Sequence, residues 1–234
     1  MRFHTIKALV TGGATGIGRE IARRLIAEGA EAAICGRRRD RVEEAASALG
    51  CLGFVGDVGN EADAQRLVAS AIAGLGGLNV LVNNAAFGRF AELSTQDCAD
   101  FEAVLKTNVT GAMLMAREAS RHFTAQRTGT IMNIGSTSGL RGGAGASAYV
   151  ASKFALRGMT ECWRAELRKH NVRVMLLNPS EVITGFAAAA GYTQTDNPTK
   201  LHAEDIAHAA LAMLSMDDVG FTTEMTVWAT NPQD

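Results

Sequence analysis

The chain has 234 residues, of which 47% are hydrophobic and 20% are charged, and its formal net charge at pH 7 is −1. These values suit a single α/β domain and exclude the broad basic field that favours nucleic acid. The longest alanine-rich stretch, residues 185–191, is far shorter than a membrane span, so we expect no membrane contact.

Short apolar segments alternate with longer segments of helical pattern along the whole chain. This alternation predicts one doubly wound α/β domain over residues 1–234, with about seven parallel strands flanked by helices. The predicted strands are residues 6–10, 32–35, 52–55, 80–82, 130–134, 173–177 and 225–228. The predicted helices are residues 17–28, 39–49, 62–74, 97–124, 149–169 and 203–214.

Residues 179–202 form the one long irregular segment, and they follow the sixth predicted strand. Ligands of open α/β sheets bind outside the carboxyl ends of the strands, so we predict a substrate loop here. A poorly ordered surface excursion is the alternative.

A glycine-rich turn joins the first predicted strand to the first helix, with the spacing Gly12-xxx-Gly16-x-Gly18. Such glycines let the backbone approach a pyrophosphate that rests on the helix N-terminus. No Gly-Lys-Ser/Thr sequence follows, which excludes a Walker-type loop. We therefore predict dinucleotide binding, with contacts from Gly12, Thr15, Gly16, Ile17 and Gly18.

The end of the second predicted strand discriminates between the two nicotinamide cofactors. Gly36 stands where an acidic residue would bind a ribose 2′-hydroxyl, and three arginines follow it. An arginine fork suits a 2′-phosphate, so we predict NADP(H), with Arg37 as the first contact and Arg38 beside it. The alternative is that these arginines only solvate the start of a helix.

Two further strand ends carry candidate cofactor contacts. Asp57 and Val58 follow the third strand, and Asp57 is placed to bind the adenine amino group or to form an ordinary Asx turn. Asn84 and Ala85 follow the fourth strand, where the amide can brace the sheet edge and shape the floor beside the adenine ribose. A purely structural role for the asparagines is the alternative.

The cysteines, Cys35, Cys51, Cys98 and Cys162, are widely scattered. Neither they nor the histidines have the spacing of metal ligands, so we expect no metal site. Scattered thiols are typical of a reducing compartment, and a strand-like segment at residues 6–10 leaves no evident signal peptide. We therefore expect a cytoplasmic protein.

Tyr149 and Lys153 are four residues apart in a predicted helix, which places their side chains on one face. An ammonium beside a phenol favours the phenolate, so we expect a lowered pKa for Tyr149 and proton exchange with an alcohol or carbonyl oxygen. The same spacing is also common on solvated helices.

Together these motifs resemble the short-chain dehydrogenase/reductase family over essentially the whole chain. The resemblance rests on Thr11-Gly12-xxx-Gly16-x-Gly18, Asn83-Asn84-Ala85, Asn108, Ser136 and Tyr149-xxx-Lys153, in the family's order. It implies a Rossmann-type fold and a homotetramer or homodimer. The overall pattern of the sequence is most similar to bacterial 3-oxoacyl-thioester reductases and related ketone reductases.

The resemblance also implies four catalytic roles. Tyr149 is the general acid, Lys153 binds the nicotinamide ribose and lowers the pKa of Tyr149, and Ser136 binds the substrate oxygen. Asn108 holds a water that links Lys153 to solvent. The alternatives are a strand-end cap for Ser136 and a satisfied polar residue within a helix for Asn108.

Two positions depart from the family pattern. Ala86 stands where the family usually has glycine, and Ser180 replaces the glycine that usually follows Pro179. Because glycine gives easy access to positive φ, we expect a different turn after Pro179. Val182 and Thr184 still fit as contacts to the nicotinamide carboxamide.

The predicted substrate pocket is apolar and is lined by Phe87, Ser138, Leu140 and Phe186. Arg141 either adds an anionic contact or is only solvated, and Arg127 falls where acyl-carrier-protein reductases place a docking arginine. The sequence predicts an NADP(H)-dependent enzyme that interconverts a ketone, or a 3-oxoacyl thioester, and a secondary alcohol. The alternative is a non-catalytic NADP(H) sensor of the same fold.

Overall fold

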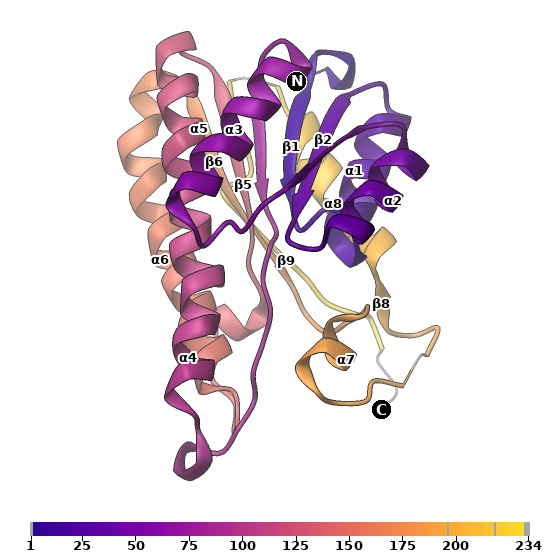
Figure 1. Cartoon of the computed structure of the whole chain (residues 1–234), viewed down its shortest axis with the longest axis vertical. Helices are drawn as coiled ribbons and strands as arrows, with labels where there is room; N and C mark the ends of the chain where they lie inside the picture. Colours follow the sequence, from indigo (N-terminus) through magenta and orange to yellow (C-terminus); the bar gives the residue numbers. More distant parts are fainter. Residues whose placement is uncertain (1, 196, 218, 232–234) are drawn as a thin grey trace.

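The structure is a computed structural model that describes residues 2–195, 197–217 and 219–231. In this part of the chain seven strands form one parallel sheet in the order β3-β2-β1-β4-β5-β6-β9 (Figure 1). The strands are β1 (Lys7–Thr11), β2 (Glu31–Gly36), β3 (Leu52–Val55), β4 (Val80–Asn83), β5 (Gly129–Ile134), β6 (Val172–Pro179) and β9 (Glu224–Val227). All seven predicted strands are confirmed.

Strand order reverses at β1, which pairs with β2 on one side and with β4 on the other. Val10 is thus the register partner of Ile34 in β2 and of Val82 in β4. The chain connections that follow β1 and β4 run toward opposite edges of the sheet. In folds of this kind a crevice opens at such a reversal point, here at the carboxyl ends of β1 and β4. The predicted site residues gather at this edge.

Helices cover both faces of the sheet (Figure 1). One face carries α1 (Gly16–Ala27), α2 (Arg39–Leu49) and α8 (Ala203–Ser215). The other carries α3 (Glu61–Leu75), α5 (Ala112–Gln126) and α6 (Ser147–Leu167). The doubly wound fold predicted from the sequence is therefore confirmed.

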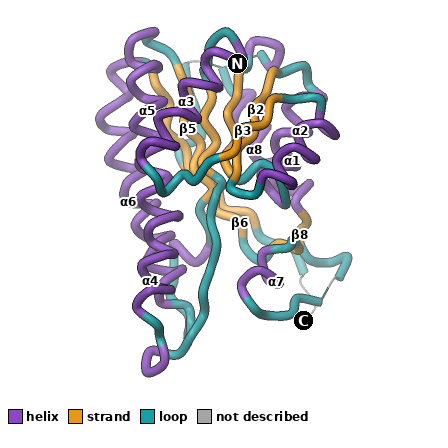
Figure 2. Tube along the Cα trace, in the orientation of Figure 1, coloured by secondary structure: helices purple, strands orange, loops and turns teal. Residues whose placement is uncertain are grey.

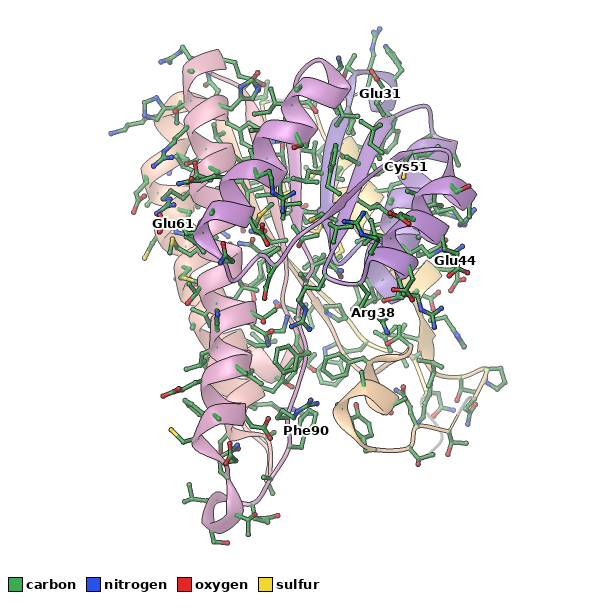
Figure 3. All side chains as sticks on the ribbon, viewed as in Figure 1. Glu31, Arg38, Glu44, Cys51, Glu61 and Phe90 are labelled. Atoms are coloured by element: carbon green, nitrogen blue, oxygen red, sulfur yellow. The ribbon has the colours of Figure 1, made fainter. Side chains whose placement is uncertain are left out.

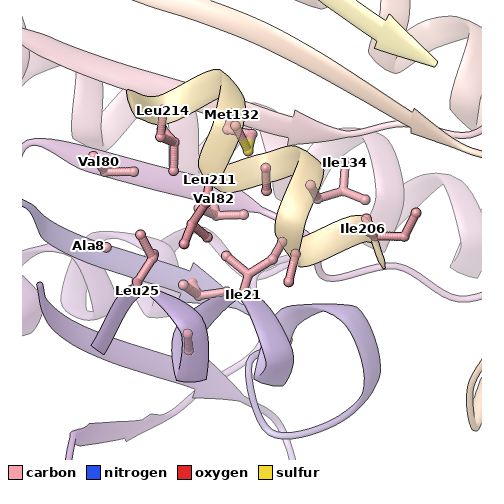
Figure 4. Packing of buried hydrophobic residues seen from close by; sticks show 14 of the residues in the cluster. Ala8, Ile21, Leu25, Val80, Val82, Met132, Ile134, Ile206, Leu211 and Leu214 are labelled. Atoms are coloured by element: carbon pink, nitrogen blue, oxygen red, sulfur yellow. The ribbon is translucent and has the colours of Figure 1, made fainter. Parts of the chain in front are cut away.

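Apolar stripes on these helices bury against the sheet. Ile21 and Leu25 of α1 lie beside Leu211 and Leu214 of α8, over side chains of the central strands (Figure 4). On the opposite face Phe123 of α5 is fully buried. Each such side chain contributes about 1.5–3 kcal/mol relative to exposure, so the core fixes the strand ends that carry the site.

The predicted helix 97–124 is divided. It comprises α4 (Cys98–Leu105), a π-helical turn η3 (Lys106–Gly111) and α5. Wide turns of this kind occur where a side chain competes with the regular backbone ladder, often at functional sites. Asn108 lies inside the turn, and its side chain binds the chain after β4. The helical pattern alone does not encode this long-range contact.

The described residues of the segment 179–202 contain more regular structure than predicted. It contains β7 (Val182–Ile183), α7 (Phe186–Ala190) and β8 (Leu201–His202), and β7 pairs with β8. Figure 2 shows this small unit below the main sheet, beside an arm formed by residues 84–105, which carries α4. Val182 and Ile183 pair with residues 201 and 202, so the segment returns to its starting point.

Within the described residues, no helix is long and apolar enough to cross a membrane. In the same residues, no three His, Cys, Asp or Glu side chains gather as a metal site would require.

Candidate active site

The glycine turn between β1 and α1 is packed tightly against the chain that follows β4. Gly12 has φ +62°, and a Cβ there would lie 3.0 Å from Ala85 Cα. A Cβ on Gly18 would press on the Asn84 side-chain amide and on Gly12 O. Gly16, with φ +54°, has only Thr184 nearby, at 3.6 Å from its would-be Cβ. Because these positions are glycines, they have no side chains that would cover the backbone of the turn or the positive N-terminal end of α1. A pyrophosphate could therefore bind there.

Asn84 braces this turn. Its Nδ2 donates to Thr11 O at 2.9 Å and to Gly12 O at 3.2 Å. The backbone N–H groups of Asn84 and Ala85 both donate to Thr11 Oγ1 at 3.0 Å. These hydrogen bonds tie the ends of β1 and β4 together.

The three arginines after β2 have different surroundings. Arg39 pairs with Glu43 one helical turn later, at 3.1 Å, and both side chains are exposed. The Arg37 guanidinium instead lies 5.8 Å from the centre of the Phe87 ring, which follows β4. Arg37 therefore reaches across the crevice, while Arg38 is exposed near the start of α2 (Figure 3).

Asp57 forms the turn that was the alternative interpretation. Its Oδ1 accepts from the N–H of Gly59 at 2.9 Å, and its own N–H donates to Asp63 Oδ2 at 2.8 Å. Val58 is 6% exposed and packs within the core beside Gly111. The Val58 side chain is thus a core residue, and only its backbone remains for a ligand contact.

A groove of about 250 Å³ that the sequence did not predict lies between α1 and α2. Arg19 of α1 faces Arg41 and Glu44 of α2 across it. The remaining lining comes from Ala14, Thr15, Gly16, Ala45 and Ala48. The lining residues of α2 stand at positions 41, 44, 45 and 48, which places them on one face of the helix. This spacing was the sequence signal for the groove.

Ser136, Tyr149 and Lys153 come together where β5 ends beside α6. The Ser136 side chain lies within reach of a hydrogen bond to the Tyr149 hydroxyl. Lys153 is 3% exposed, its Nζ donates to Ile134 O at 2.8 Å, and it lies 5.6 Å from the centre of the Tyr149 ring. Ser136 also accepts from the N–H of Ser138 at 3.1 Å. The predicted constellation is therefore assembled, and Ser136 serves as a local cap as well.

The expected lowering of the Tyr149 pKa is wrong for this structure. Burial raises the pKa of Tyr149 to about 12, although the hydrogen bond from Ser136 opposes the rise. Burial also lowers the pKa of Lys153 to about 8. The sequence shows the spacing of the pair but not its burial, which disfavours both charged forms. The Lys153 ammonium faces the Tyr149 ring and Ile134 O, so it does little to stabilise the phenolate form of Tyr149.

Asn108 is buried, and its side chain is fully engaged. Its Oδ1 accepts from Phe87 N at 3.0 Å, and its Nδ2 donates to Phe87 O at 2.9 Å and to Ser152 Oγ at 3.0 Å. Ser152, which was not predicted, donates onward to Tyr149 O at 2.7 Å. The alternative of a satisfied helical asparagine describes this side chain. It joins the chain after β4 to the helix that carries Tyr149.

Aromatic rings cover Tyr149. The ring centres of Phe186 in α7 and Phe90 lie 5.4 Å and 5.9 Å from that of Tyr149. Tyr192 follows α7, and its ring centre lies 5.6 Å from that of Phe90. Phe90 lies between the arm with α4 and the segment with α7 (Figure 3). The sequence predicted Phe186 but not Phe90 or Tyr192. The only sequence signal for these two rings was their position: Phe90 follows the fourth strand near Phe87, and Tyr192 lies within the predicted substrate loop.

The turn after Pro179 accommodates Ser180 without positive φ. The Ser180 N–H donates to Val227 O at 2.9 Å, which prolongs the pairing of β6 with β9. Thr184 lies beside Gly16, and its Oγ1 accepts from Phe186 N at 3.3 Å. These contacts link the glycine turn to the aromatic rings.

The remaining predicted contacts lie at the edges of the site. Leu140 is 37% exposed, whereas Ser138 and Phe87 are half-buried. Arg141 lies 5.2 Å from the centre of the Trp228 ring. Arg127 has φ 55° and donates to Lys169 O at 3.4 Å.

The sequence profile of the short chain dehydrogenase family matches residues 7–195. The chain belongs to this family. It is 33% identical over 229 residues to "Oxidoreductase asL5" of Sarocladium schorii, covering 94% of this chain and 92% of that protein. It is also 36% identical over 177 residues to a 3-oxoacyl-[acyl-carrier-protein] reductase of Bos taurus, covering 75% of each.

A solved structure of serine dehydrogenase, the closed form complexed with NADP+, superposes on the chain with a TM-score of 0.87. The two are 29% identical, and the alignment covers 94% of this chain and 93% of that one. The resemblance inferred from the motifs is thus confirmed. As a short-chain dehydrogenase, the protein is a member of an oxidoreductase family that uses nicotinamide cofactors.

Proposed function

We propose that the protein is an NADP(H)-dependent oxidoreductase that interconverts a ketone and a secondary alcohol, with Tyr149 as general acid and base. One observation carries this proposal. The Ser136, Tyr149 and Lys153 side chains meet at the carboxyl end of β5. Thr184 and Phe186 connect that point to the glycine turn.

The residues around the crevice fit a dinucleotide. The turn with Gly12 leads into Gly16 and Gly18 in the first turn of α1, where the helix dipole favours a pyrophosphate. Arg37 and Arg38 are the proposed partners of a 2′-phosphate, and Thr15 and Ile17 lie in the same turn. Further proposed contacts are Asp57, Val58, Asn84, Ala85, Pro179, Val182 and Thr184.

When bound, NADP(H) supplies or accepts the hydride. Tyr149 stays protonated at neutral pH because burial raises its pKa, so its hydroxyl can donate to a carbonyl oxygen. The Ser136 hydroxyl donates to the same oxygen as charge develops there. Lys153 holds the helix against β5, and its buried ammonium is the proposed partner of the nicotinamide ribose. In alcohol oxidation the same groups act in reverse.

We assign the proton path between Lys153 and solvent to the backbone of η3. The Asn108 side chain is occupied by Phe87 and Ser152. A π-helical turn disturbs the regular backbone ladder, which leaves main-chain groups for a water.

Several broader assignments belong to the same proposal. Residues 1–234 act as one NADP(H)-binding oxidoreductase domain, and residues 179–202 act as its substrate loop. The partner is a small-molecule ketone or alcohol, and a 3-oxoacyl thioester is supported by the bovine reductase relative. We also propose a cytoplasmic homotetramer or homodimer.

Two measurements test the proposal. Purified protein with NADPH is offered a panel of ketones, diketones and 3-oxoacyl thioesters, and we expect NADPH oxidation with at least one. Tyr149→Phe should then lower kcat by about 10²–10⁴-fold, the usual size of general acid catalysis, while the Kd for NADPH is unchanged. NADPH binding without turnover of any panel member would instead favour the NADP(H) sensor.

A further inference from the structure

Three rings close over the catalytic tyrosine from separate parts of the chain. Phe90 comes from the loop after β4, Phe186 from α7, and Tyr192 lies two residues after the end of α7. Their centres lie 5.4–5.9 Å from Tyr149 or from one another, and the Phe90–Tyr192 pair is edge-on at 86°. We call Phe90, Phe186 and Tyr192 the aromatic box.

The backbone is adapted to this packing. Gly88 is buried below the rings, and a Cβ there would lie 2.8 Å from the Phe90 ring and 3.1 Å from the Phe186 ring. Any larger residue would wedge these two rings apart. The outer rings remain accessible, with 39% of Phe90 and 44% of Tyr192 exposed. The box can therefore admit a ligand from solvent by movement of its outer rings.

The nearest arginines are held by other groups. Arg89 pairs with Asp100 at 3.4 Å and donates to Ala189 O at 3.0 Å. Arg141 lies over Trp228. A carboxylate in the box would lose hydration and would have to compete with Asp100 and Ala189 O for Arg89 and with Trp228 for Arg141, which is a cost. The box therefore disfavours anionic substrates.

We propose that the aromatic box selects uncharged ketones whose carbonyl is attached to a flat ring, and that Phe90 and Tyr192 are specificity-determining residues. The inference rests on the proposed ketone chemistry of Tyr149. A flat ring that enters the box replaces the ring–ring contacts it disturbs with offset or edge-to-face contacts of its own. A flexible alkyl chain buries apolar area but lacks these contacts, and it loses rotational freedom on binding.

Two matched pairs of ketones test the selection. Acetophenone and 2-octanone have the same number of carbon atoms, and we expect kcat/KM with NADPH to favour acetophenone about tenfold or more. 4-Methylacetophenone and 4-acetylbenzoate differ in a methyl and a carboxylate, and we expect at least about a hundredfold preference for the methyl compound. Equal kcat/KM within either pair would overturn the proposal.

Variants assign the selection to the box. Phe90→Leu and Tyr192→Leu each keep an apolar side chain but remove the ring, so the acetophenone preference should fall severalfold in each. Phe3→Leu is the matched control, because Phe3 lies in the turn before β1, at the opposite end of the strands. A preference that survives both box substitutions would also overturn the proposal.

Ligand binding separates failure of the box from failure of the proposed chemistry. If neither pair is reduced, saturation-transfer NMR on the NADP+-bound protein compares acetophenone with 2-octanone. Stronger saturation of acetophenone, lost in Phe90→Leu and kept in Phe3→Leu, supports the box although the reaction proposal fails. Equal saturation of the two ketones contradicts the box.

Discussion

Lys153 donates a 2.8 Å hydrogen bond from its buried ammonium to Ile134 O, the carbonyl of the last residue of β5. This bond holds the first third of α6 against the strand that leads to Ser136. The ammonium is buried, and Ile134 O is an uncharged partner. Burial therefore lowers the pKa of Lys153 to about 8. The site is thus assembled at a cost in stability.

The first prediction concerns this cost. Unfolded Lys153 keeps its ordinary pKa near 10.5, so between pH 8 and 10.5 the unfolded chain binds more protons than the folded one. Stability from this group therefore rises with pH across that window and is flat below it. Lys153→Met lacks the buried charge, so the protein without cofactor should be more stable than wild type at pH 7, by on the order of 1–3 kcal/mol.

Urea unfolding at several pH values measures the effect. The advantage of Lys153→Met should shrink from pH 8 to pH 10.5, while ketone reduction is lost at every pH. Tyr149 acts mainly above this window, because its raised pKa makes its contribution to stability fall between about pH 10 and 12 in both proteins. A Lys153→Met difference that does not change with pH would contradict the assigned burial cost.

The second prediction concerns cofactor choice. Arg37→Ser should weaken NADPH binding by about 10–100-fold, because a charged hydrogen bond to phosphate contributes about 1.5–3 kcal/mol. NADH binding should change little. Arg39→Ser is the matched control, since Arg39 pairs with Glu43 on the surface. Calorimetric Kd values for both cofactors decide, and equal losses in the two variants would contradict a specific role for Arg37.

The sequence predicted the features that depend on local pattern. The seven strands follow from apolar runs, and the glycine turn follows from its position between β1 and α1. Contacts between distant segments outside the family motifs were missed. The box brings Phe90 and Tyr192 to the predicted Phe186, and the π-helical turn carries the Asn108 side chain that contacts Phe87. Spacing predicts which side chains share a face, but burial determines the pKa of each.

The third prediction concerns Asn108. Asn108→Ala leaves the backbone N–H and carbonyl of Phe87 without their partners, and Ser152 Oγ keeps only its hydrogen bond to Tyr149 O. Each buried group left unsatisfied costs about 1–3 kcal/mol, so the free energy of unfolding should fall by about 3 kcal/mol. Ser152→Ala should cost less, about 1 kcal/mol. The double variant should lose less than the sum of the two single variants, because both remove one shared hydrogen bond. Strict additivity in urea unfolding would show that the bond does not couple them.

The last prediction compares two glycines inside helices. A Cβ on Gly18 in the first turn of α1 would press on the Asn84 amide and on Gly12 O. Gly158 in α6 has nothing within 4 Å of its would-be Cβ. Gly158→Ala should therefore stabilise the protein by about 0.5–1 kcal/mol through helix propensity, with NADPH binding unchanged. Gly18→Ala gains the same propensity but must displace the brace of the turn, so it should destabilise the protein and weaken NADPH binding. Thermal unfolding with and without NADPH measures both, and a Gly18→Ala protein that binds NADPH like wild type would show that the turn does not hold the cofactor.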